Sequence, residues 1–597
     1  LVDGFSQLPG VARIRLSGAT RFAMRIWLDR EALAARGLTV LDVERALRQQ
    51  NVELPAGAVQ GSDRALTVRL KRNFTTPAEF ASLVVKRGED GYQVLLGEVA
   101  RVELGAEDAR RKFNGNGVPM VALGVIKQSR ANTLDVARAA KAHAEKVRQI
   151  LPDGVSLEQS YDTSQFIESS IHEVYETLGI AVVLVVLVIY LFLGTARATL
   201  IPFVAVPVSV IATCILLHAF GYSINVLTLL SMVLAIGLVV DDAIVMLENI
   251  HRRIEEGEAP LVAAYRGARQ VGFAVVATTL VLAAVFVPIS FLEGDLGKLF
   301  AEFGVPLAVA VVFSSFVALT ACPMLASLVL RRKERGGITA LVDVVFRFLQ
   351  RRYEWLLRRA LRQPAAVFAF LIGCAALTWW LQRQIPSEFT PKEDRGSFFV
   401  ITSAPQGSSY GRSLEMFAEI EKRLMYLVDT GEVPRLLVRV PRSFGTNSDF
   451  NEVITIVNLN DFGKRRDAWS IMEEVRGALS GMTGVQTFVI MRQALSRGLT
   501  KPVQFVIGGP SYETLLEWRD LIVERARDNP GLVGLDYDYK ETKPQVSVGI
   551  DRRRAADLGV PVSSIGQSLE ILFGQKRATT FVDHGEEYDV VLEGDYD

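Results

Sequence analysis

The sequence INVLTLLSMVLAIGLVVDDAIVMLENI, residues 224–250, decides the class of the fold. Its apolar and small residues run through 233–240 and 243–247, so Asp241 and Asp242 lie well inside an apolar segment. As an α-helix the segment would be about 40 Å long, which exceeds the ~30 Å hydrocarbon core of a bilayer. We therefore predict that this segment crosses a membrane.

Five further apolar runs resemble this one in length and composition. They cover residues 179–194, 199–220, 271–292, 303–330 and 365–381. Hydrophobic residues make up 50% of the 597 residues, while 1–165 and 386–597 mix polar and apolar residues as soluble domains do. We predict a polytopic α-helical membrane protein with six spans in this chain and two extramembrane lobes.

The overall composition excludes several other classes. The 66 basic and 66 acidic residues balance, so no charge excess indicates nucleic-acid binding. The three cysteines lie in apolar runs and cannot form a disulfide framework. The sequence contains no phosphate-binding Gly-Lys-Ser/Thr loop and no His/Cys metal spacing, so we expect neither ATP drive nor a bound metal or other cofactor.

The charged loops between the spans predict the topology. Basic side chains follow the first, third and fifth spans, at Arg197, within 251–269 and within 331–335. In the loops on the opposite side, the only basic residue is Lys298. By the positive-inside rule the basic loops are cytoplasmic and both lobes face the periplasm or the cell exterior. Residues 338–362 interleave apolar residues with arginines, which predicts an amphipathic helix on the cytoplasmic membrane surface, with a solvated linker helix as the alternative.

Strand–helix–strand patterns recur in both lobes. The three units comprise 118–126, 132–150 and 154–162; 397–405, 410–428 and 435–440; and 501–509, 511–528 and 531–539. Units of this length predict right-handed βαβ crossovers in ferredoxin-like, α+β subdomains.

A duplication is visible across the lobes. DREALAARGLTV at 29–40 and DRRRAADLGVPV at 551–562 share five identities in twelve, 522 positions apart (551 − 29). The alternating strands before them, at 24–28 and 546–550, keep the same phase. We predict a parent of roughly a thousand residues with about twelve spans in two parallel repeats, of which this chain is a fragment that starts mid-pattern.

The two adjacent aspartates are candidate functional residues. A charged side chain at mid-membrane costs ~2.5–3.5 kcal/mol on insertion scales, so a pair of them predicts a function. Burial beside a like charge disfavours double ionisation and permits reversible protonation. The six spans contain no Lys or Arg at mid-depth, so a cationic partner is expected outside this chain. The alternative is that Asp241 and Asp242 only hydrogen-bond neighbouring helices, whereas Glu248 and His218 are expected near the interfaces.

Five stretches together resemble the inner-membrane permeases of the resistance–nodulation–division (RND) superfamily, in the hydrophobe/amphiphile efflux branch. They are SMVLAIGLVVDDAIVMLENIHRRIEEGEAP (231–260), IHEVYETLGIAVVLVVLVIYLFLGTARATLIP (171–202), FGYSIN (220–225), IPSEFTPKEDRGSF (385–398) and RIWLDREALAARGLTVLDVERALRQQN (25–51). The double aspartate in this setting is unlike the metal-exporting branch, whose matching span usually carries a single Asp followed by Gly.

The resemblance implies a homotrimeric, multi-pass bacterial inner-membrane protein that exports amphiphiles by antiport with protons. It implies that Asp241 and Asp242 are the proton-relay carboxylates. It implies a periplasmic adaptor and an outer-membrane channel as partners, and no cofactor besides the proton gradient. The implied domains are a second porter subdomain at 1–30 and 106–160; a first docking subdomain at 31–105, with a protomer-bridging hairpin at 51–70; five spans within 166–334; the amphipathic helix 338–362; a span at 363–386; third and fourth porter subdomains at 396–500 and 501–550; and the start of a second docking subdomain at 551–597.

The family's drug pocket lies in the porter lobe, is lined with phenylalanines and is closed by a glycine-rich loop. By resemblance the substrate-binding candidates are Leu16, Phe113, Phe444 and Phe450. The matching loop 440–453 is shorter here, and Arg110 with Arg111 beside Phe113 are unlike an apolar multidrug pocket. Core packing is the alternative for each phenylalanine.

Other functions remain open at this point. A relative driven by the same proton gradient could move metal ions, lipids or exported proteins. Methionine clusters in the lobes would favour metal ions, but the methionines are scattered. Two intramembrane aspartates also suggest an aspartyl protease, but that chemistry needs two carboxyls converging ~3 Å apart, normally from separate helices. A non-transporting scaffold or sensor would leave the buried pair without a use.

Overall fold

The structure is a computed structural model of the chain. It describes residues 1–52, 55–69, 74–89, 91–193, 195–331, 338–385, 393–442, 449–492, 503–532 and 534–595. The chain divides into two compact units, each with its own core. Residues 162–391 form the helical unit, and residues 1–161 with 392–597 form the α/β unit.

The helical unit contains the predicted spans. Within the described residues six helices are long and apolar enough to cross a membrane, as expected from the sequence. The helices of this unit are α6 (Ser164–Leu193), α7 (Ala196–Ala219), α8 (Val226–Glu255), α9 (Pro260–Phe286), η2 (Val287–Phe291), α10 (Gly294–Val329), α11 (Ile338–Arg362) and α12 (Pro364–Gln382). The amphipathic stretch predicted at 338–362 is the helix α11.

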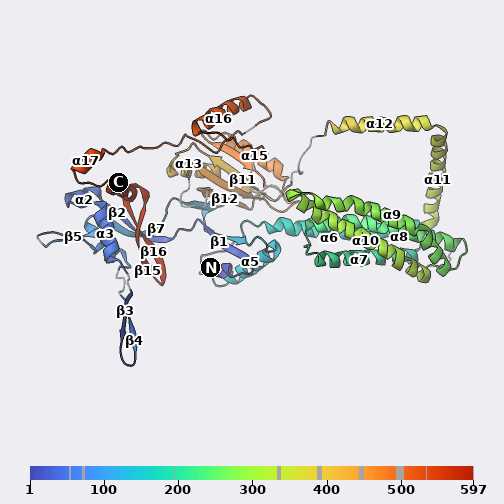
Figure 1. Ribbon diagram of the computed structural model, residues 1–597, viewed down its shortest axis with the longest axis horizontal. Coiled ribbons are helices and arrows are strands. Elements are labelled where there is room, and N and C mark those ends of the chain that lie inside the picture. Colours follow the sequence, from blue (N-terminus) through green and yellow to red (C-terminus); the bar gives the residue numbers. More distant parts are fainter. Residues whose placement is uncertain are drawn as a thin grey trace. The chain divides into compact units, whose positions relative to one another are not determined.

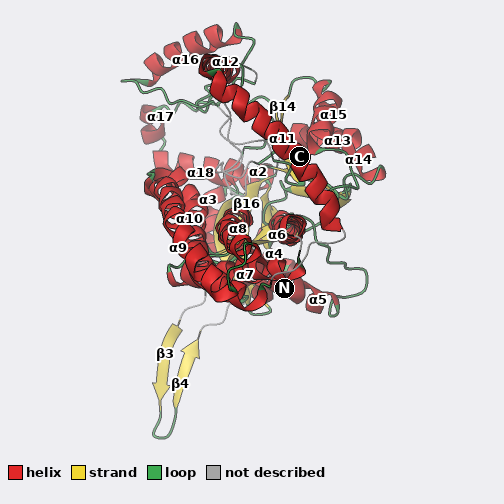
Figure 2. Ribbon diagram, turned by 90° about the vertical axis from the view of Figure 1, so that its right-hand side faces the viewer, coloured by secondary structure: helices red, strands yellow, loops and turns green. Residues whose placement is uncertain are grey.

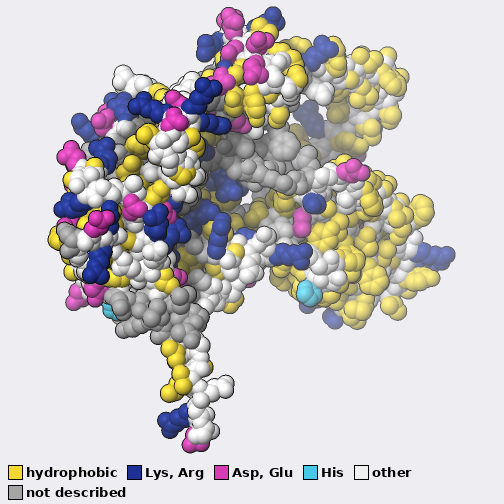
Figure 3. Space-filling view, turned by 60° about the vertical axis from the view of Figure 1, so that its left-hand side comes forward, with side chains coloured by type: hydrophobic (Ala, Val, Ile, Leu, Met, Phe, Trp, Pro, Cys, Tyr) yellow, Lys and Arg dark blue, Asp and Glu magenta, His cyan; other side chains and the backbone are white. Residues whose placement is uncertain are grey.

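Helices α6–α10 pack side by side (Figure 1), with α10 against α7, α8 and α9. Ile201, Val239 and Leu307 lie in their common core and are almost completely buried. The outer surface is apolar as well: Phe273 is 84% exposed, and hydrophobic side chains cover the helical unit in Figure 3. An apolar exterior around an apolar core is what a protein in lipid requires.

Helix α12 differs from the other spans because none of its residues, 364–382, is buried. The only element against which it has a broad contact among the described residues is α11. An apolar helix without a packed face is stable only in lipid or against other helices.

The α/β unit is built on a six-stranded sheet in which every neighbouring pair is antiparallel. Its spatial order is β14 (Gln486–Ile490), β11 (Ser397–Ser403), β13 (Glu452–Asn458), β12 (Arg435–Val440), β8 (Lys112–Gly115) and β9 (Val118–Pro119). Because β11 and β12 both run antiparallel to β13, they are parallel to each other. The helix α13 (Tyr410–Leu424) connects them, as predicted for this strand–helix–strand unit.

Helices α13 and α15 (Ala468–Ser480) cover this sheet with amphipathic faces. Phe398 of β11, Phe417 of α13 and Ile471 of α15 are completely buried in the same core. β8 and β9 come from the first lobe and extend the sheet through the β8–β12 pair, so the two lobes share one sheet.

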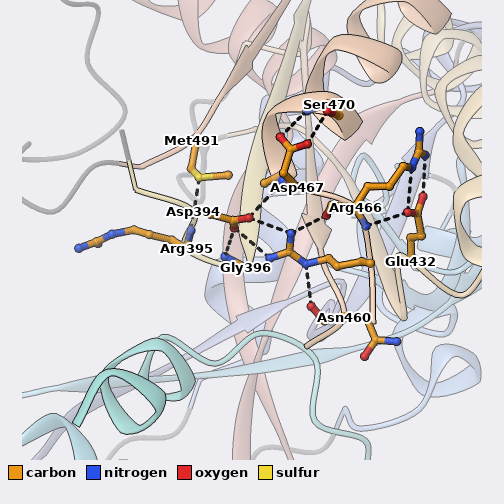
Figure 4. Close-up of polar contacts among 11 residues, drawn as sticks. Asp394, Arg395, Gly396, Glu432, Asn460, Arg466, Asp467, Ser470 and Met491 are labelled. Atoms are coloured by element: carbon orange, nitrogen blue, oxygen red, sulfur yellow. Dashed lines mark hydrogen bonds and ion pairs between the residues drawn. The ribbon is translucent and has the colours of Figure 1, made fainter. Parts of the chain in front are cut away.

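An ion pair fixes the entry into β11 (Figure 4). The guanidinium of Arg465, whose side chain is 1% exposed, donates to both carboxylate oxygens of Asp394 at 2.8 and 2.9 Å. The backbone N–H groups of Gly396 and Ala468 donate to the same carboxylate. Burial alone would raise the pKa of Asp394, but these donors outweigh it and lower the pKa.

The first unit predicted in the first lobe is only partly correct. The strand expected at 118–126 is divided between β9 and β10 (Ala122–Lys127), and β10 pairs with β1 (Val11–Ser17) in a separate sheet. The helix expected at 132–150 is α5 (Thr133–Arg148). The strand expected at 154–162 is absent from these described residues. Side chains, rather than the backbone of a neighbouring strand, form hydrogen bonds with this stretch. Arg148 donates to the carbonyl of Leu157, and Asn458 donates to the carbonyl of Ser160.

A four-stranded sheet joins the two ends of the chain. Its order is β15 (Lys576–Asp583), β16 (Glu586–Gly594), β2 (Phe22–Leu28) and β7 (Ala100–Ala106), with β16 parallel to β2. The remaining elements are α1 (Val2–Ser6), α2 (Arg30–Ala35), α3 (Val40–Gln50), β3 (Pro55–Gln60), β4 (Ala65–Arg69), α4 (Pro77–Ala81), β5 (Val84–Arg87), β6 (Gln93–Leu95), η1 (Leu96–Glu98), α14 (Tyr426–Asp429), α16 (Tyr512–Arg527), α17 (Arg552–Asp557) and α18 (Val562–Gly574).

The duplication is visible in the helices. α2 and α17 begin 522 positions apart (552 − 30), and α3 and α18 do so too (562 − 40). Asp29 and Asp551 cap α2 and α17 in the same way, each accepting two backbone N–H groups. Gly37 and Gly559 both adopt positive φ, 61° and 67°.

The strands predicted in 501–550 do not form in the described residues. Helix α16 forms as expected, but the described residues of 503–509, 531–539 and 544–550 are not in strands. A strand needs a partner for its ladder of hydrogen bonds, and no described strand pairs with these stretches. Val506 and Val546 are accordingly 97% and 94% exposed.

The hairpin predicted at 51–70 is formed by β3 and β4 over the described residues 55–69. It projects away from the rest of the α/β unit in both Figure 1 and Figure 2. Val59 and Leu66 are 61% and 64% exposed on it. At the repeat distance of 522, this hairpin corresponds to β15–β16, which is packed against β2.

Candidate functional site: a carboxylate pair in α8 and a basic recess in the α/β unit

Helix α8 carries both candidate relay residues on an unbroken run from Val226 to Glu255. Asn225 caps it by accepting the backbone N–H groups of Leu227 and Thr228, and its side-chain amide donates to Glu302 of α10 at 2.8 Å. The helix therefore starts at a fixed position against α10.

One face of α8 is fixed by packing. Val239, Ala243 and Met246 are almost completely buried against neighbouring helices. The buried hydroxyl of Ser314 in α10 donates to the carbonyl of Val239 at 2.9 Å. This contact lies only two residues before the aspartates, so the backbone that carries them is held in place.

The opposite face of α8 is open. Its exposed residues recur at helical spacing and form a stripe, which we call the α8 stripe: Leu230, Leu234, Gly237, Asp241, Val245 and Glu248. Asp241 lies in the middle of the α8 stripe, and Asp242 is half-buried at its border, as expected for neighbours ~100° apart on a helix.

Neither carboxylate has an ion pair or a hydrogen bond to any side chain in the described part of the helical unit. No group of three or more metal-ligating side chains occurs among the described residues either. The two aspartates can therefore exchange protons or pair with a cation, but they do not converge from two helices on one water. His218 is exposed near the end of α7, and Glu248 is exposed two turns beyond Asp241.

The α/β unit contains a recess of roughly 290 Å³, part of it open to solvent. It is lined by Leu16, Ser17, Gly18, Arg111, Lys112, Arg439, Val440 and Pro441. The end of β1 can approach β8 here because residue 18 is glycine: its φ is +76°, and a Cβ would lie 2.4 Å from the carbonyl oxygen of Met120. The recess lies where β1, β8 and β12 meet.

The predicted substrate-binding residues have different surroundings. Leu16 lines the recess and is 42% exposed. Phe113 is 7% exposed, lies opposite Arg439 in the β8–β12 pair and is not among the residues that line the recess. Phe450 is half-buried, packs edge-on against Tyr410 at 5.5 Å and carries the guanidinium of Arg110 over its ring. Phe444 lies outside the described residues.

A family model described as the AcrB/AcrD/AcrF family matches residues 1–597. The chain belongs to the AcrB/AcrD/AcrF family. This result confirms the resemblance to RND efflux permeases, which are secondary active transporters rather than enzymes.

Curated relatives in this family align with the whole chain. They are the solvent-resistant pump membrane transporter SrpB of Pseudomonas putida (34% identical), the toluene efflux pump membrane transporter TtgE, also of Pseudomonas putida (33%), and the multidrug resistance protein MdtC of Pantoea ananatis (32%). The chain spans 58% of the length of each.

Within this family member, sequence reasoning missed the contribution of Arg439 to the recess. Arg439 interrupts the apolar run that follows Arg435 in the strand RLLVRV, and that interruption was the available signal. An arginine inside a half-buried strand requires a polar surrounding, which the recess provides. Sequence reasoning also could not place Asp241, as opposed to Asp242, at the centre of the open face.

Proposed function

We propose that the chain is part of a proton-driven efflux transporter that exports drugs or other amphiphilic compounds from a bacterial inner membrane. The observation that carries this proposal is the position of Asp241: a carboxylate at mid-span, on the open face of a helix whose other face is fixed. The names of the relatives, which mention solvents, toluene and multidrug resistance, support amphiphiles as the exported class.

In this mechanism the α8 stripe faces spans of the complete transporter that lie outside the present chain, and a cation on one of them pairs with the ionised Asp241. A proton that binds the carboxylate removes the charge attraction and lets the facing helices shift. Asp242, at the border of the stripe, takes part in the same proton exchange. Helix α6 begins at Ser164, directly after the α/β unit in the chain, and carries the movement toward the substrate site by alternating access.

The test is Asp241→Asn in the complete transporter, because the amide keeps the shape and removes the titratable proton. We expect loss of drug or solvent resistance at unchanged expression and oligomeric state, measured by susceptibility and by efflux of a fluorescent amphiphile. Glu248→Gln, on the same stripe about 10 Å further along the helix, is the matched control and should keep activity. Undiminished resistance in the Asp241 variant would refute the relay assignment.

We also propose that the complete transporter is a homotrimer with a periplasmic adaptor and an outer-membrane channel, and that both lobes are periplasmic. The strand–helix–strand topology of β11–β14 supports a ferredoxin-like third porter subdomain at 396–500. The second porter subdomain would comprise 1–30 and 106–160, the fourth 501–550, and the docking subdomains 31–105 and 551–597 onward. The distribution of basic loops supports this orientation.

The β3–β4 hairpin is proposed to bridge protomers, and the duplication specifies its partner. β16 pairs in parallel with β2, with Val590 beside Met24. Shifted by 522 positions, this pairing places Val68 of β4 beside Val546, and both side chains are exposed, at 41% and 94%. We infer that β4 adds to residues 544–550 of a neighbouring copy as a parallel strand.

Paired cysteines test this contact. In the complete transporter, Val68→Cys together with Val546→Cys should give an intermolecular disulfide under mild oxidation, seen as a ladder of dimers and trimers on a non-reducing gel. Val59→Cys with Val546→Cys is the control, because Val59 lies on the other strand of the hairpin. Equal crosslinking of both pairs would contradict the proposed register.

The alternatives are less well supported. A metal-ion exporter would be favoured by a ligand cluster, and the described residues contain none. Lipids or exported proteins as cargo would be distinguished from amphiphiles by the same susceptibility profile. An intramembrane aspartyl protease needs two converging carboxyls, whereas Asp241 and Asp242 diverge on one helix.

A further inference from the structure

Helix α11 carries an excess of basic side chains that the transport mechanism does not use. Its residues 347–362, whose side chains the structure describes, include six arginines and a single acid, Glu354. Glu354 lies 3.8 Å from Arg358, and because both side chains are exposed this ion pair is weak. The arginines of α11 that have no ion pair among the described residues are Arg351, Arg352, Arg359 and Arg362.

Apolar side chains line one side of the same helix. They recur at helical spacing and form a stripe, which we call the α11 stripe: Leu349, Tyr353, Leu356 and Ala360. Leu349 and Leu356 are 53% and 59% exposed, so nothing in the described part of the chain covers them. An apolar stripe on an otherwise basic helix is typical of a helix that lies in the interface of a membrane.

The neighbouring span fixes the level of α11 in the membrane. Helix α12 starts at Pro364, and its 19 residues are about 28 Å long, close to the thickness of the hydrocarbon core. Trp379 and Trp380 lie at its far end, and the guanidinium of Arg383 lies 3.7 Å above the ring of Trp379, as in an aromatic belt at one interface. The start of α12, and with it the end of α11, therefore lies at the opposite interface.

The direction of α11 agrees with this level. Its axis runs across the axes of α6 and α12, both of which it contacts (Figures 1 and 2). A helix that crosses the ends of spans lies along the plane of the membrane. The α11 stripe can then face the acyl chains over the whole described length of the helix.

Two of the arginines lie at the border of the α11 stripe. At ~100° per residue, Arg352 and Arg359 lie about 80° from the middle of the stripe, whereas Arg351 and Arg358 lie about 170° away. With the stripe in the acyl chains, Arg352 and Arg359 are at the depth of the lipid head groups, and the other two arginines point into water. Charge is thus present at two different depths on one helix.

Each border arginine is stacked on an aromatic side chain one turn earlier. The guanidinium of Arg352 lies over the ring of Phe348 at 5.4 Å, and that of Arg359 lies over Trp355 at 5.6 Å. Such i, i+4 pairs stabilise an exposed helix slightly, but this does not explain why both lie on the same border of the stripe. Stacking occupies the face of a guanidinium and leaves the N–H groups in its plane available to an acceptor.

We propose that this border of α11 binds the phosphate groups of anionic phospholipids in the adjacent leaflet, with Arg352 and Arg359 as the ligands. Each guanidinium donates to phosphodiester oxygens, and the two are about 10 Å apart along the helix. The ligand is a lipid rather than free phosphate, because the α11 stripe requires hydrocarbon next to the phosphate. The sequence predicts only a helix on the membrane surface, whereas the structure assigns the lipid class and the two arginines. This site does not depend on the proposed proton relay.

A fluorophore on the stripe measures the local lipid composition. Leu356 lies between Arg352 and Arg359 on the helix surface, so Leu356→Cys, labelled with NBD in a complete transporter whose other cysteines are replaced, reports on this site. The transporter is reconstituted in phosphatidylcholine bilayers that contain nitroxide-labelled phosphatidylglycerol or, separately, nitroxide-labelled phosphatidylcholine at the same mole fraction. Quenching by the anionic lipid should exceed quenching by the zwitterionic lipid, and the ratio of the two quenching constants is the readout.

Two pairs of substitutions remove the same charge from different depths. Arg352→Gln with Arg359→Gln should lower the ratio by about thirtyfold, because each arginine near an anionic surface contributes roughly a fivefold factor. Arg351→Gln with Arg358→Gln, each one position earlier, is the matched control and should change the ratio by less than about threefold. Arg352→Lys with Arg359→Lys should keep much of the ratio, because the charge remains. All of these side chains are exposed, so the variants should fold and assemble normally.

The outcomes separate this proposal from other occupants of α11. A ratio that falls in the Arg352/Arg359 pair and persists in the Arg351/Arg358 pair supports the site. Equal quenching by both lipids shows a membrane-surface helix without selectivity and overturns the proposal. Quenching by neither lipid shows that α11 lies in water or under other spans, and an equal fall in both pairs shows diffuse charge rather than a site. Each of these results overturns it, and none of them affects the test of Asp241.

Discussion

The two copies of the duplicated motif have the same pattern and different structures. FAMRIWL at 22–28 is the strand β2, which lies between β16 and β7, and its Met24 and Ile26 are almost completely buried. PQVSVGI at 544–550 is not a strand, and Val546 and Val548, at the equivalent positions, are 94% and 57% exposed. The helices that follow the two segments nevertheless begin at equivalent residues.

The difference shows which elements of this fold are determined by their own segment and which depend on a partner elsewhere in the chain. A helix forms its hydrogen bonds within one segment, so an Asp cap and a glycine with positive φ define α2 and α17 alike. A strand depends on a neighbour, and β2 has two while 544–550 has none in the described chain. The second copy is thus a strand without its partner, which is the reason for expecting β4 of another copy there.

The largest expected effect comes from a substitution in the buried copy of the strand, β2. Ile26→Ala should destabilise the four-stranded sheet by about 2–5 kcal/mol, because it removes buried methyl groups and leaves a cavity. Val548→Ala, its equivalent, should change stability by less than about 0.5 kcal/mol in this chain, because the side chain is mostly in solvent. Hydrogen–deuterium exchange of peptides from β2 and β7 in detergent-solubilised protein measures both.

The same substitution at Val548 has a different expected effect in the assembled transporter. If 544–550 becomes a strand between copies, Val548→Ala should weaken the trimer although it does not affect the single chain. A large effect of Val548→Ala on the monomeric chain would instead show that 544–550 is already packed within it.

The sequence predicted most of the helical unit because a membrane span is encoded locally. Apolar length alone located all six spans, and arginines interleaved with apolar residues predicted α11 as an amphipathic helix. Asp241 and Asp242 were predicted as functional residues because two charges within an apolar run are conspicuous. Which of the two lies on the open face depends on the packing of α8 against α10, for example through Ser314, and no local pattern contains that information.

The α/β unit was harder to predict because its strands depend on remote partners. β11, β12 and β13 pair within about sixty residues, and the strand–helix–strand unit from β11 to β12 was predicted correctly. The stretch 118–126 was predicted as one strand but divides between two sheets, because β8 pairs with β12 more than 300 positions away. The recess depends on the same long-range pairing, and of the four substrate-binding candidates only Leu16 is among its lining residues in the described chain.

The smallest expected effect tests the part of the comparison that the two copies share. Asp29→Ala and Asp551→Ala each remove a side chain that accepts two backbone N–H groups at a helix start. Each should destabilise its helix by about 1 kcal/mol. The two values should be similar even though Leu33 of α2 lies in a large hydrophobic core and α17 contributes no residue to that core. Exchange rates in α2 and α17 measure them separately, with Asp29→Asn and Asp551→Asn as controls that keep the cap. A much larger loss for Asp29 than for Asp551 would show that packing, rather than the local cap, determines the start of α2, and the division into local helices and partner-dependent strands would then fail.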